Sequence, residues 1–310
     1  MFIDYKTACE HLKRGEVVAI PTETVYGLAA SLSCSEAIDQ IFTLKKRPAD
    51  NPLIIHVADS SQVEHFAKDI PQGFSILANT FWPGPLTLVL PAQKEWVPGA
   101  VRANLDTVAF RIPNHPLTLQ VLAEVGPLVM PSANLAGKPS ATSPKHVEND
   151  FGKNFPVLDG GECQSGVEST ILIYIEEQWK IIRQGALSAE AFEEFLGYQP
   201  KVGGQVNNKS PLCPGQLYKH YAPSATLVLD TDVNPETIGV VIGFSDRTYP
   251  QSCDVFLLGP SSDPCEVARN LYNVLRSLDQ KEIESAWVDM DFPKNGLWAT
   301  IEERLQKASG

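Results

Sequence analysis

The sequence predicts an α/β protein organised in two domains. Its 310 residues are more than a single hydrophobic core usually organises. The composition, with 43% hydrophobic and 20% charged residues, is typical of a folded chain. Short apolar runs such as 17–20 alternate with amphipathic segments such as 35–46, the pattern of strands followed by helices. Glycine, proline and asparagine are dense at 201–224, so this stretch is expected to link a first domain at 1–200 to a smaller α/β unit at 225–310.

The charge balance argues against tight, autonomous nucleic-acid binding. The chain has 25 basic and 37 acidic residues, a net charge of −12, and residues 1–205 alone hold 16 basic and 23 acidic residues. A protein that grips nucleic acid through phosphates normally shows a basic excess. No apolar run approaches the roughly 20 residues that span a bilayer, and we see no secretory signal. We therefore expect a cytoplasmic protein with no membrane partner.

The cysteines give no support for a metal site. The six lie at positions 9, 34, 163, 213, 253 and 265, with no C-x-x-C spacing and no H-E-x-x-H motif. In a cytoplasmic chain they are expected to be reduced, mostly buried thiols.

Residues 20–28, Ile-Pro-Thr-Glu-Thr-Val-Tyr-Gly-Leu, form the segment around which the first domain is expected to be organised. They follow a buried strand and lead to a helix with Ser35 as its expected N-cap. Polar side chains at the end of a strand are typical of ligand sites in open α/β sheets. The alternative is an ordinary strand-to-helix connection whose hydroxyls cap backbone groups, so the segment needs partners elsewhere to make a site.

Basic residues supply two candidate partners. The helix at 35–46 ends in Lys45-Lys46-Arg47-Pro48, which either complements the helix dipole or holds a polyphosphate. Arg111 lies inside the apolar strand 108–113, and a buried arginine needs an anion, supplied by a ligand or by an internal salt bridge. His56, within the strand 53–57, is by itself more typical of a core histidine than of a ligand contact.

Small polar residues also follow the expected strand at 128–130. Pro131-Ser-Ala-Asn and the segment to Thr142 suit close approach to a phosphate or ribose, and residues 160–170 form another small-residue turn before a strand. Neither a Walker A loop nor a G-x-G-x-x-G fingerprint occurs. The linker contains Tyr218-Lys-His-Tyr221, which a plain spacer would not need, so we expect it to fold back over a site. The unit 225–310 shows no catalytic constellation and is expected to dock or regulate.

Several motifs occur together and in order: Pro21-Thr-Glu-Thr-Val-Tyr-Gly-Leu, Lys45-x-Arg47-Pro with Asn51-Pro-Leu, Trp82-Pro-Gly-Pro-Leu-Thr, Arg111-Ile-Pro and Pro131-Ser-Ala-Asn. In combination they resemble the YrdC-like family of L-threonylcarbamoyladenylate synthases. Residues 213–223 resemble the linker of its longer, two-domain form, although Cys213 stands where serine is common. Ala136 likewise replaces the usual serine of Ser-Ala-Asn-x-Ser-Gly. The resemblance covers essentially the whole chain.

The resemblance implies both a fold and a reaction. The fold is a twisted, open mixed sheet with helices and a concave basic cavity, followed by a small Rossmann-like α/β domain. The reaction converts L-threonine, bicarbonate (or CO2) and ATP to threonylcarbamoyl-AMP, pyrophosphate and water, a step toward N6-threonylcarbamoyladenosine at position 37 of certain tRNAs. Positioning and charge neutralisation would supply most of the catalysis, because the nucleophile and the leaving group are both anionic.

The matching motif positions also imply roles for individual residues. A threonine pocket would be lined by Thr24, His56, Arg111, Ser132 and Ser169. ATP would be held by Arg47, Asn51, Thr107, Asn134, Thr142, Arg183 and, closing over it from the linker, Tyr221. Lys45, Arg47 and Arg111 would be the catalytic cations, with Lys45 supporting the phosphates.

The resemblance further implies Mg2+ bound with the triphosphate rather than in a protein cage. The product would pass to the tRNA threonylcarbamoyl-transferase complex. An RNA-binding module without this catalysis is the main alternative, and the acidic balance of both halves weakens it. Carbamoyl transfer in hydrogenase maturation is a weaker alternative, because those larger proteins carry zinc-finger cysteine pairs and an acylphosphatase-like region that this chain lacks.

Overall fold

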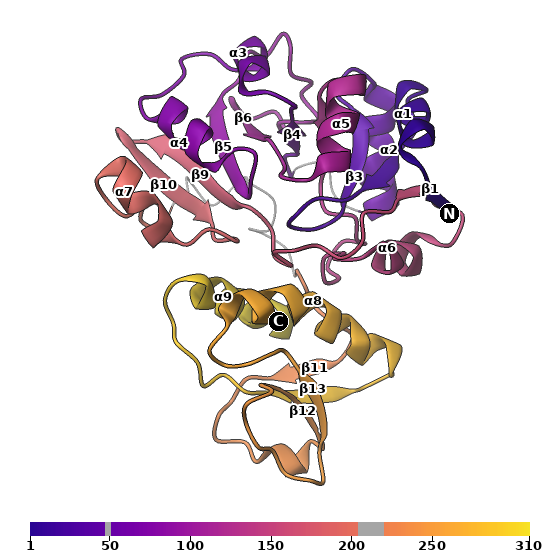
Figure 1. Cartoon of the computed structure of the whole chain (residues 1–310), viewed down its shortest axis with the longest axis vertical. Helices are drawn as coiled ribbons and strands as arrows, with labels where there is room; N and C mark the ends of the chain where they lie inside the picture. The colour runs from indigo at the N-terminus through magenta and orange to yellow at the C-terminus, as the bar shows by residue number, and fades with distance from the viewer. Residues whose placement is uncertain (47–50, 204–219) are drawn as a thin grey trace.

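The computed structural model describes residues 1–46, 51–203 and 220–310. Over these ranges the chain forms a ten-stranded mixed sheet and a separate four-stranded sheet whose strands are all parallel. Figure 1 shows the smaller unit below the larger one, with its helices facing the larger unit. The predicted fold class, an open mixed α/β sheet followed by a smaller Rossmann-like unit, is confirmed.

The large sheet has the strand order β1-β8-β2-β3-β7-β4-β6-β5-β9-β10. Parallel pairs such as β4–β6 and β5–β9 alternate with antiparallel pairs such as β5–β6 and β9–β10. Its strands are β1 (Phe2–Ile3), β2 (Val18–Ile20), β3 (Gly27–Ser31), β4 (Ile54–His56), β5 (Leu86–Pro91), β6 (Thr107–Arg111), β7 (Leu128–Val129), β8 (Val157–Leu158), β9 (Thr170–Ile175) and β10 (Gln178–Arg183).

Residues 21–26 form a hairpin loop, and the strand-to-helix connection expected from the sequence is wrong. β2 runs antiparallel to β3, with Ile20 opposite Gly27. The apolar run 27–31 is a strand because its alternate residues pack into different cores, Leu28 into one and Ala29 into another. The following helix, α2 (Ser35–Lys45), takes Cys34 as its N-cap without a side-chain cap bond, so Ser35 is the first helical residue and not the cap.

Helices cover the large sheet and supply its cores. α2 and α4 contribute Ile41 and Leu77 to one cluster, while α1 and α5 contribute Leu12 and Leu122 to another. The periodicity of residues 35–46 predicts α2, whereas the sequence patterns do not predict α5 and α6. The helices of this domain are α1 (Tyr5–Lys13), α2 (Ser35–Lys45), α3 (Val63–Phe66), α4 (Phe74–Phe81), α5 (Pro116–Val125), α6 (Pro144–Phe151) and α7 (Glu193–Leu196), with 3-10 turns η1 (Ser60–Gln62) and η2 (Ala189–Phe192).

The small sheet has the order β11-β14-β12-β13 and carries two long helices. The side chain of Asp263 caps α8 by accepting hydrogen bonds from the N–H groups of Cys265 and Glu266. The apolar residues of this helix recur at helical spacing, and residues such as Leu271 and Leu275 are fully buried. Its elements are β11 (Thr226–Val228), η3 (Pro235–Thr237), β12 (Val240–Gly243), β13 (Asp254–Leu257), α8 (Pro264–Gln280), β14 (Ser285–Val288) and α9 (Leu297–Ser309).

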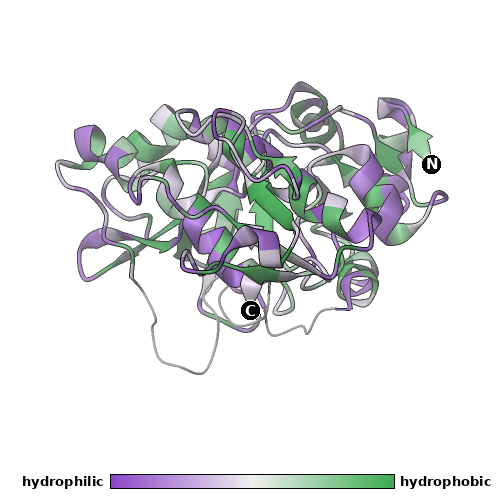
Figure 2. Cartoon of the chain, turned by 90° about the horizontal axis from the view of Figure 1, so that it is seen from below, coloured by the Kyte–Doolittle hydropathy of each residue, from purple (hydrophilic) through white to green (hydrophobic). Residues whose placement is uncertain are grey.

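Seen from below, green strands lie near the centre of the molecule and the surrounding helices carry both green and purple segments (Figure 2). This distribution fits helices that bury one face only. None of the helices in the described ranges is long and apolar enough to cross a membrane. The predicted domain boundaries at 200/201 and 224/225 stay a prediction, because most of the expected linker lies outside the described residues.

Candidate active site

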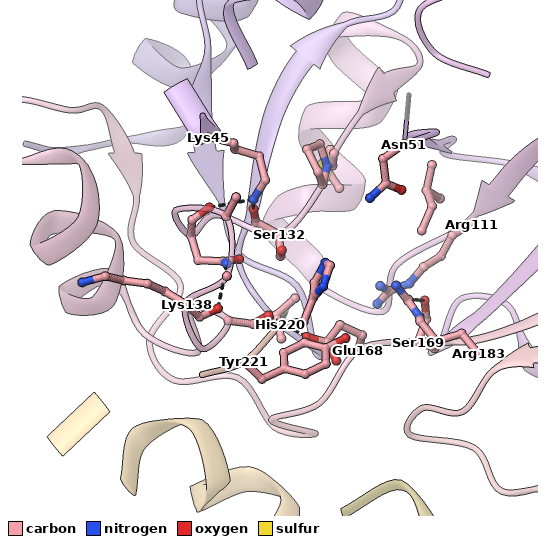
Figure 3. A pocket seen from close by; sticks show the side chains of 18 of the residues that line it. Lys45, Asn51, Arg111, Ser132, Lys138, Glu168, Ser169, Arg183, His220 and Tyr221 are labelled. Carbon is pink, nitrogen blue, oxygen red and sulfur yellow. Dashed lines mark hydrogen bonds between the residues drawn. The ribbon is translucent and has the colours of Figure 1, made fainter. Parts of the chain in front are cut away.

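A cavity of about 380 Å³ lies on one face of the large sheet. Ile54 and His56, alternate residues of β4, both line it, as does Arg111, the register partner of His56 on β6. The cavity therefore sits on the face of the sheet and not only beyond its strand ends (Figure 3). Nine of the residues predicted from the sequence line it: Lys45, Asn51, His56, Arg111, Ser132, Asn134, Ser169, Arg183 and Tyr221.

Arg111 is buried and ion-paired. Its Nη2 lies 2.8 Å from Oε2 of Glu23, and its Nε donates a hydrogen bond of 3.2 Å to the carbonyl of Gly84. The internal salt bridge that the sequence left open is therefore present. Because the same guanidinium lines the cavity, it is also placed to meet a ligand anion.

His56 is a neutral hydrogen-bonding group. Burial lowers its pKa well below the usual value of 6.5, and the neighbouring cation Arg111 lowers it further. Its Nδ1 lies 3.2 Å from the carbonyl of Ile54, so Nδ1 carries the proton and donates it there. In this tautomer Nε2 is an acceptor, which suits a hydroxyl or amine of a ligand.

Ser169 is fixed by two neighbours at the start of β9. Its hydroxyl lies 2.7 Å from that of Thr87, and Nη2 of Arg183 donates to both its Oγ (3.0 Å) and its carbonyl (2.9 Å). Arg183 ends β10, which is antiparallel to β9, so the two residues meet because of the hairpin. The predicted threonine-pocket and ATP-binding residues Ser169 and Arg183 are thus in direct contact.

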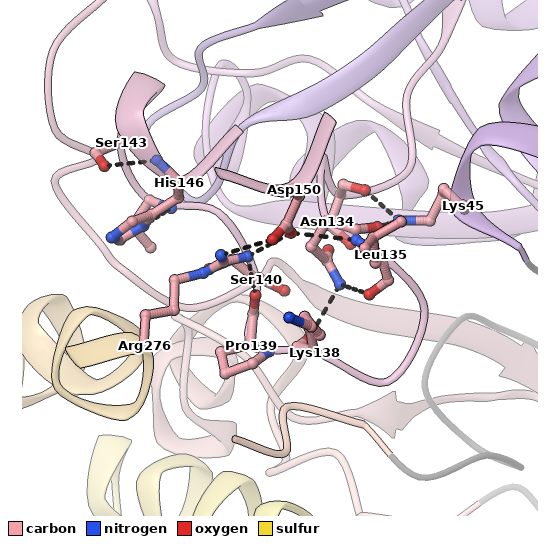
Figure 4. A network of polar contacts seen from close by, with 12 residues as sticks. Lys45, Asn134, Leu135, Lys138, Pro139, Ser140, Ser143, His146, Asp150 and Arg276 are labelled. Atoms are coloured by element: carbon pink, nitrogen blue, oxygen red, sulfur yellow. Dashed lines mark hydrogen bonds and ion pairs between the residues drawn. The ribbon is translucent and has the colours of Figure 1, made fainter. Parts of the chain in front are cut away.

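The loop after β7 forms the opposite wall. Lys45, at the end of α2, donates hydrogen bonds to the carbonyls of Ser132 and Asn134, the latter at 2.7 Å. Asn134 Nδ2 donates to the carbonyls of Leu135 (2.8 Å) and Lys138 (3.0 Å). Lys45, which is expected to support phosphates, therefore also anchors the loop after β7 (Figure 4).

A second arginine holds this loop from the C-terminal domain. Arg276 of α8 pairs with Asp150 of α6 at 2.8 Å, with side chains 6% and 3% exposed. It also donates to the carbonyl of Pro139 at 2.6 Å, and Asp150 accepts the N–H of Leu135 at 3.2 Å. Figure 4 shows these contacts as one continuous network. The loop is therefore anchored from both domains.

Three predicted residues lie outside the lining of the cavity. Thr24 is fully buried, with its hydroxyl 2.8 Å from that of Thr22, as in the alternative of a loop whose hydroxyls bond locally. Thr107 begins β6, at the end opposite Arg111. Thr142 is buried, and its N–H donates to Nδ1 of His146 at 3.2 Å. Arg47 lies outside the described residues, so its predicted roles stay predictions.

The cavity is also lined by residues that the sequence motifs do not indicate as site residues. Lys138, Glu168 and His220 line it together with Lys46 and Ser140. Lys138 could have been selected from its place between Gly137 and Pro139 in a phosphate-type loop. Glu168 has no comparable signal, because two of its partners, Tyr272 and Arg304, come from the distant helices α8 and α9.

The lining is cationic although the chain is acidic. Its described residues include two lysines at the end of α2, a third in the loop after β7, and two buried arginines, against the single carboxylate of Glu168. Burial by itself would raise the pKa of Glu168, but Arg304 and Arg183 lower it to about 2. A cavity with this excess of cations favours an anionic ligand such as a polyphosphate or carboxylate.

Comparisons with known proteins match both halves of the chain. Residues 10–185 match the family model described as "Telomere recombination", Sua5_yciO_yrdC, and residues 187–310 match "Threonylcarbamoyl-AMP synthase, C-terminal domain". The threonylcarbamoyl-AMP synthase of Pyrococcus abyssi is 39% identical, covering 98% of this chain and 94% of the relative. That of Bacillus subtilis is 38% identical, with 96% and 91% covered.

A solved structure superposes on the whole chain. The crystal structure of P. abyssi Sua5 complexed with L-threonine superposes with a TM-score of 0.90 and 38% identity, covering 100% of this chain and 98% of that one. The resemblance expected from the sequence motifs is confirmed, because family models match both domains. The chain belongs to the Sua5–YciO–YrdC family, in its two-domain threonylcarbamoyl-AMP synthase form.

Proposed function

We propose that the protein is an L-threonylcarbamoyladenylate synthase, which converts L-threonine, bicarbonate and ATP to threonylcarbamoyl-AMP, pyrophosphate and water. The observation that carries the proposal is one cationic cavity that brings together nine residues predicted from separate motifs. The structure of P. abyssi Sua5 complexed with L-threonine, which is similar over the full chain, supports threonine as a substrate. The names of the relatives support an enzyme that transfers a nucleotidyl group.

The threonine side of the cavity is proposed to include His56, Arg111 and Ser169. Arg111 would bind the substrate carboxylate or the carbamate, because a guanidinium matches the geometry of a carboxylate. His56 is neutral, and its Nε2 would accept a hydrogen bond from the hydroxyl or amine of threonine. Ser132 completes the predicted set from the opposite wall. Thr24 would act only through the loop that carries Glu23.

The nucleotide side is proposed to include Asn134 and the basic residues around it. Asn134 Oδ1 is buried and accepts no hydrogen bond within the described part of the chain, so it can take one from a ligand N–H or hydroxyl. Lys45, Asn51 and Arg183 would contact phosphates or ribose, with Tyr221 covering the nucleotide. Thr107 and Thr142 are proposed to influence ATP binding through neighbouring backbone, since neither lines the cavity.

Mg2+ is proposed to enter with ATP. Glu168 is the one carboxylate among the described lining residues, and its oxygens already accept hydrogen bonds from Ser140, Tyr272 and Arg304. The lining residues therefore do not fit a magnesium site built from protein ligands alone. Phosphate oxygens of ATP and water are suitable ligands for the ion. When bound, the ion would neutralise part of the triphosphate charge.

The reaction needs no protein nucleophile. The amine of threonine attacks the carbon of bicarbonate or CO2, and water leaves when bicarbonate is the source. An oxygen of the resulting carbamate attacks the α-phosphorus of ATP, and the bond to the pyrophosphate oxygen breaks. Arg111 would hold the carbamate while the lysines reduce repulsion between it and the triphosphate. Positioning and charge neutralisation therefore account for the roles of the side chains present.

The alternative of an RNA-binding module has less support. The cationic residues line a concave cavity, whereas phosphate-backbone binding needs an extended basic surface. Delivery of the product to the tRNA threonylcarbamoyl-transferase complex and a cytoplasmic location are part of the proposal and stay predictions. A salt-dependent RNA shift assay distinguishes the two functions, since the synthase is expected to show no salt-sensitive shift.

The direct test follows carbon-14 from bicarbonate into the product. The full chain is incubated with labelled bicarbonate, ATP, Mg2+ and L-threonine, and nucleotides are separated quickly by chromatography. We expect label in a new adenylate that also contains threonine. Label only in unreacted bicarbonate, with ATP consumed, would contradict the synthase assignment.

A further inference from the structure

The helices of the C-terminal domain pack directly against one wall of the cavity. Gly166 lies so close to α8 that a Cβ on it would be 2.3 Å from the Cα of Arg269. From α9, the hydroxyl of Thr300 donates a hydrogen bond of 2.9 Å to the carbonyl of Gly185. The segments 166–169 and 183–185 also carry cavity residues, so the contact between the domains supports the site (Figure 1).

Arg304 of α9 is fully buried in this interface. Its Nε donates to Oε2 of Glu168 at 3.0 Å, and its Nη2 donates to the carbonyl of Gln184 at 2.7 Å. Its Cζ lies 4.8 Å from the ring centroid of Tyr221, a cation–π contact. One side chain of the C-terminal domain therefore touches two residues that line the cavity, Glu168 and Tyr221.

Tyr221 has a backbone conformation that tyrosine rarely adopts. Its φ is 66°, in the left-handed region, yet its side chain is buried. Its ring stacks on Tyr272 of α8, with centroids 5.4 Å apart and planes at 21°. Such strain persists only where surrounding contacts determine the conformation, and here the stacking ring and the cation both come from the C-terminal domain.

Glu168 connects the same helices to the loop of the opposite wall. Its Oε1 accepts a hydrogen bond of 2.6 Å from Ser140, at the end of that loop, and its Oε2 accepts one of 3.0 Å from the hydroxyl of Tyr272. Figure 3 shows Glu168 and Tyr221 close together in the lining. Removing Arg304 would therefore disturb the ring and the carboxylate together.

We propose that Arg304 is a positioning residue of the synthase site, which holds Tyr221 over the nucleotide side of the cavity through the contacts with its ring and with Glu168. The C-terminal domain thereby supplies part of the ATP-binding geometry without contacting ATP. The inference rests on the proposed function in placing the nucleotide beside Tyr221. It assigns a role to a domain in which the sequence showed no catalytic constellation.

The test compares four full-length proteins: wild type, Arg304→Ala, Arg304→Lys and the matched control Thr300→Val. Thr300 lies one turn before Arg304 on α9, is also buried, and also bonds across the interface, but contacts neither Glu168 nor Tyr221 in the described contacts. Circular dichroism reports folding. Calorimetric titration with the ATP analogue AMP-PCP and Mg2+, without threonine, reports nucleotide binding, and steady-state assays give KM for ATP and for threonine separately.

We expect Arg304→Ala to weaken AMP-PCP binding and raise KM for ATP by about tenfold, in the usual range of coupling between sites, with KM for threonine changed by less than about threefold. Arg304→Lys is expected to be intermediate, because it keeps the charge beside Glu168 but loses the planar group over the ring. Thr300→Val is expected to bind the analogue within about twofold of wild type, since it leaves both cavity residues untouched.

A double variant separates positioning from a general loss of stability. If Arg304 acts through Tyr221, Arg304→Ala with Tyr221→Ala binds the analogue no more weakly than Tyr221→Ala alone. Additive losses, equal rises in both KM values, or a Thr300→Val effect as large as that of Arg304→Ala would overturn the proposal. If Arg304→Ala does not fold, Arg304→Lys takes its place in the same cycle. Wild type without threonine-dependent turnover would contradict the proposed function instead, while analogue binding would still decide the role of Arg304.

Discussion

Arg111 and Glu23 form a buried ion pair, with 2.8 Å between Nη2 and Oε2 and side chains 5% and 6% exposed. The pair forms because the hairpin loop 21–26 reaches the end of β6. Glu23 also accepts the N–H of Asn114 at 3.1 Å, which fixes the chain just after that strand. The segment expected to organise the domain therefore contributes to the cavity by orienting Arg111.

Arg111→Ala is expected to abolish threonine-dependent turnover, because the cation proposed to hold the carboxylate or carbamate is lost. It is also expected to lower the free energy of unfolding by about 3–5 kcal/mol, since Glu23 remains buried without its cation. Turnover assays and urea unfolding check both parts. In Arg111→Ala, the added change Glu23→Gln should recover part of the stability but none of the turnover. Normal activity in Arg111→Ala would remove this residue from the site.

Tyr221→Ala is expected to weaken ATP retention about tenfold while leaving the fold intact, because the ring that covers the nucleotide is a contact typically worth 1–3 kcal/mol. Equilibrium binding of ATP with Mg2+ gives the affinity, and circular dichroism checks the fold. Tyr221→Phe keeps the ring and is the matched control, expected to bind nearly as wild type. Unchanged ATP affinity and activity in Tyr221→Ala would show that the linker is only a spacer.

Asp150→Ala is expected to lower the free energy of unfolding by about 3 kcal/mol, because Arg276 stays buried without its carboxylate. The loop 134–140 loses an anchor as well, so ATP affinity should fall. Lys145→Ala is the control: it breaks an exposed pair with Glu148 on the same helix and should cost at most about 1 kcal/mol. Urea unfolding gives the free energy of unfolding of both variants, and titration gives their ATP affinity. Equal effects of the two substitutions would show that the buried Arg276–Asp150 pair contributes no more than the exposed one.

The folded protein is expected to lose stability as the pH falls from 6.5 toward 4. Burial lowers the pKa of His146 to about 4, and Arg276 contributes to that shift, while the pKa of His56 is also well below 6.5. In the unfolded state both rings have pKa values near 6.5 and bind protons as the pH falls below that value. Protonation therefore stabilises the unfolded state relative to the folded state. His146, with a folded-state pKa of about 4, should contribute roughly 1–2 kcal/mol between pH 6.5 and 5, and His56 should act in the same direction.

Urea unfolding at several pH values measures this dependence. His146→Gln, which keeps a polar group beside Asn273 and Thr142, should reduce the slope between pH 6.5 and 5. A slope that is the same in this variant and in wild type would show that His146 does not titrate differently in the two states.

The local sequence predicted most of the elements that build the site. Apolar runs such as 108–112 predict strands, and consecutive residues of this run are buried on both sides of the sheet. The apolar residues of α8, such as Leu271 and Leu275, likewise recur at helical spacing and are buried. The resemblance then selected residues far apart in sequence, such as Asn51 and Arg183, that the structure brings to one cavity.

The rest depends on long-range contacts that local patterns do not encode. The strand β3 was missed because Gly27 and the small residues after it have weak strand propensity, and pairing with β2 and β7 decides their conformation. The partner of Arg111 could not be identified, because any buried carboxylate satisfies the same requirement. Glu168 and Arg304 meet only through the contact between the two domains.

The central claim is tested most directly by pyrophosphate release from ATP and Mg2+, with L-threonine and bicarbonate each omitted in turn from CO2-depleted buffer. We predict release only when both are present, because the carbamate formed from them is the nucleophile that attacks the α-phosphorus. Release that is indifferent to threonine would contradict the account and leave an ATP-binding α/β protein with another substrate.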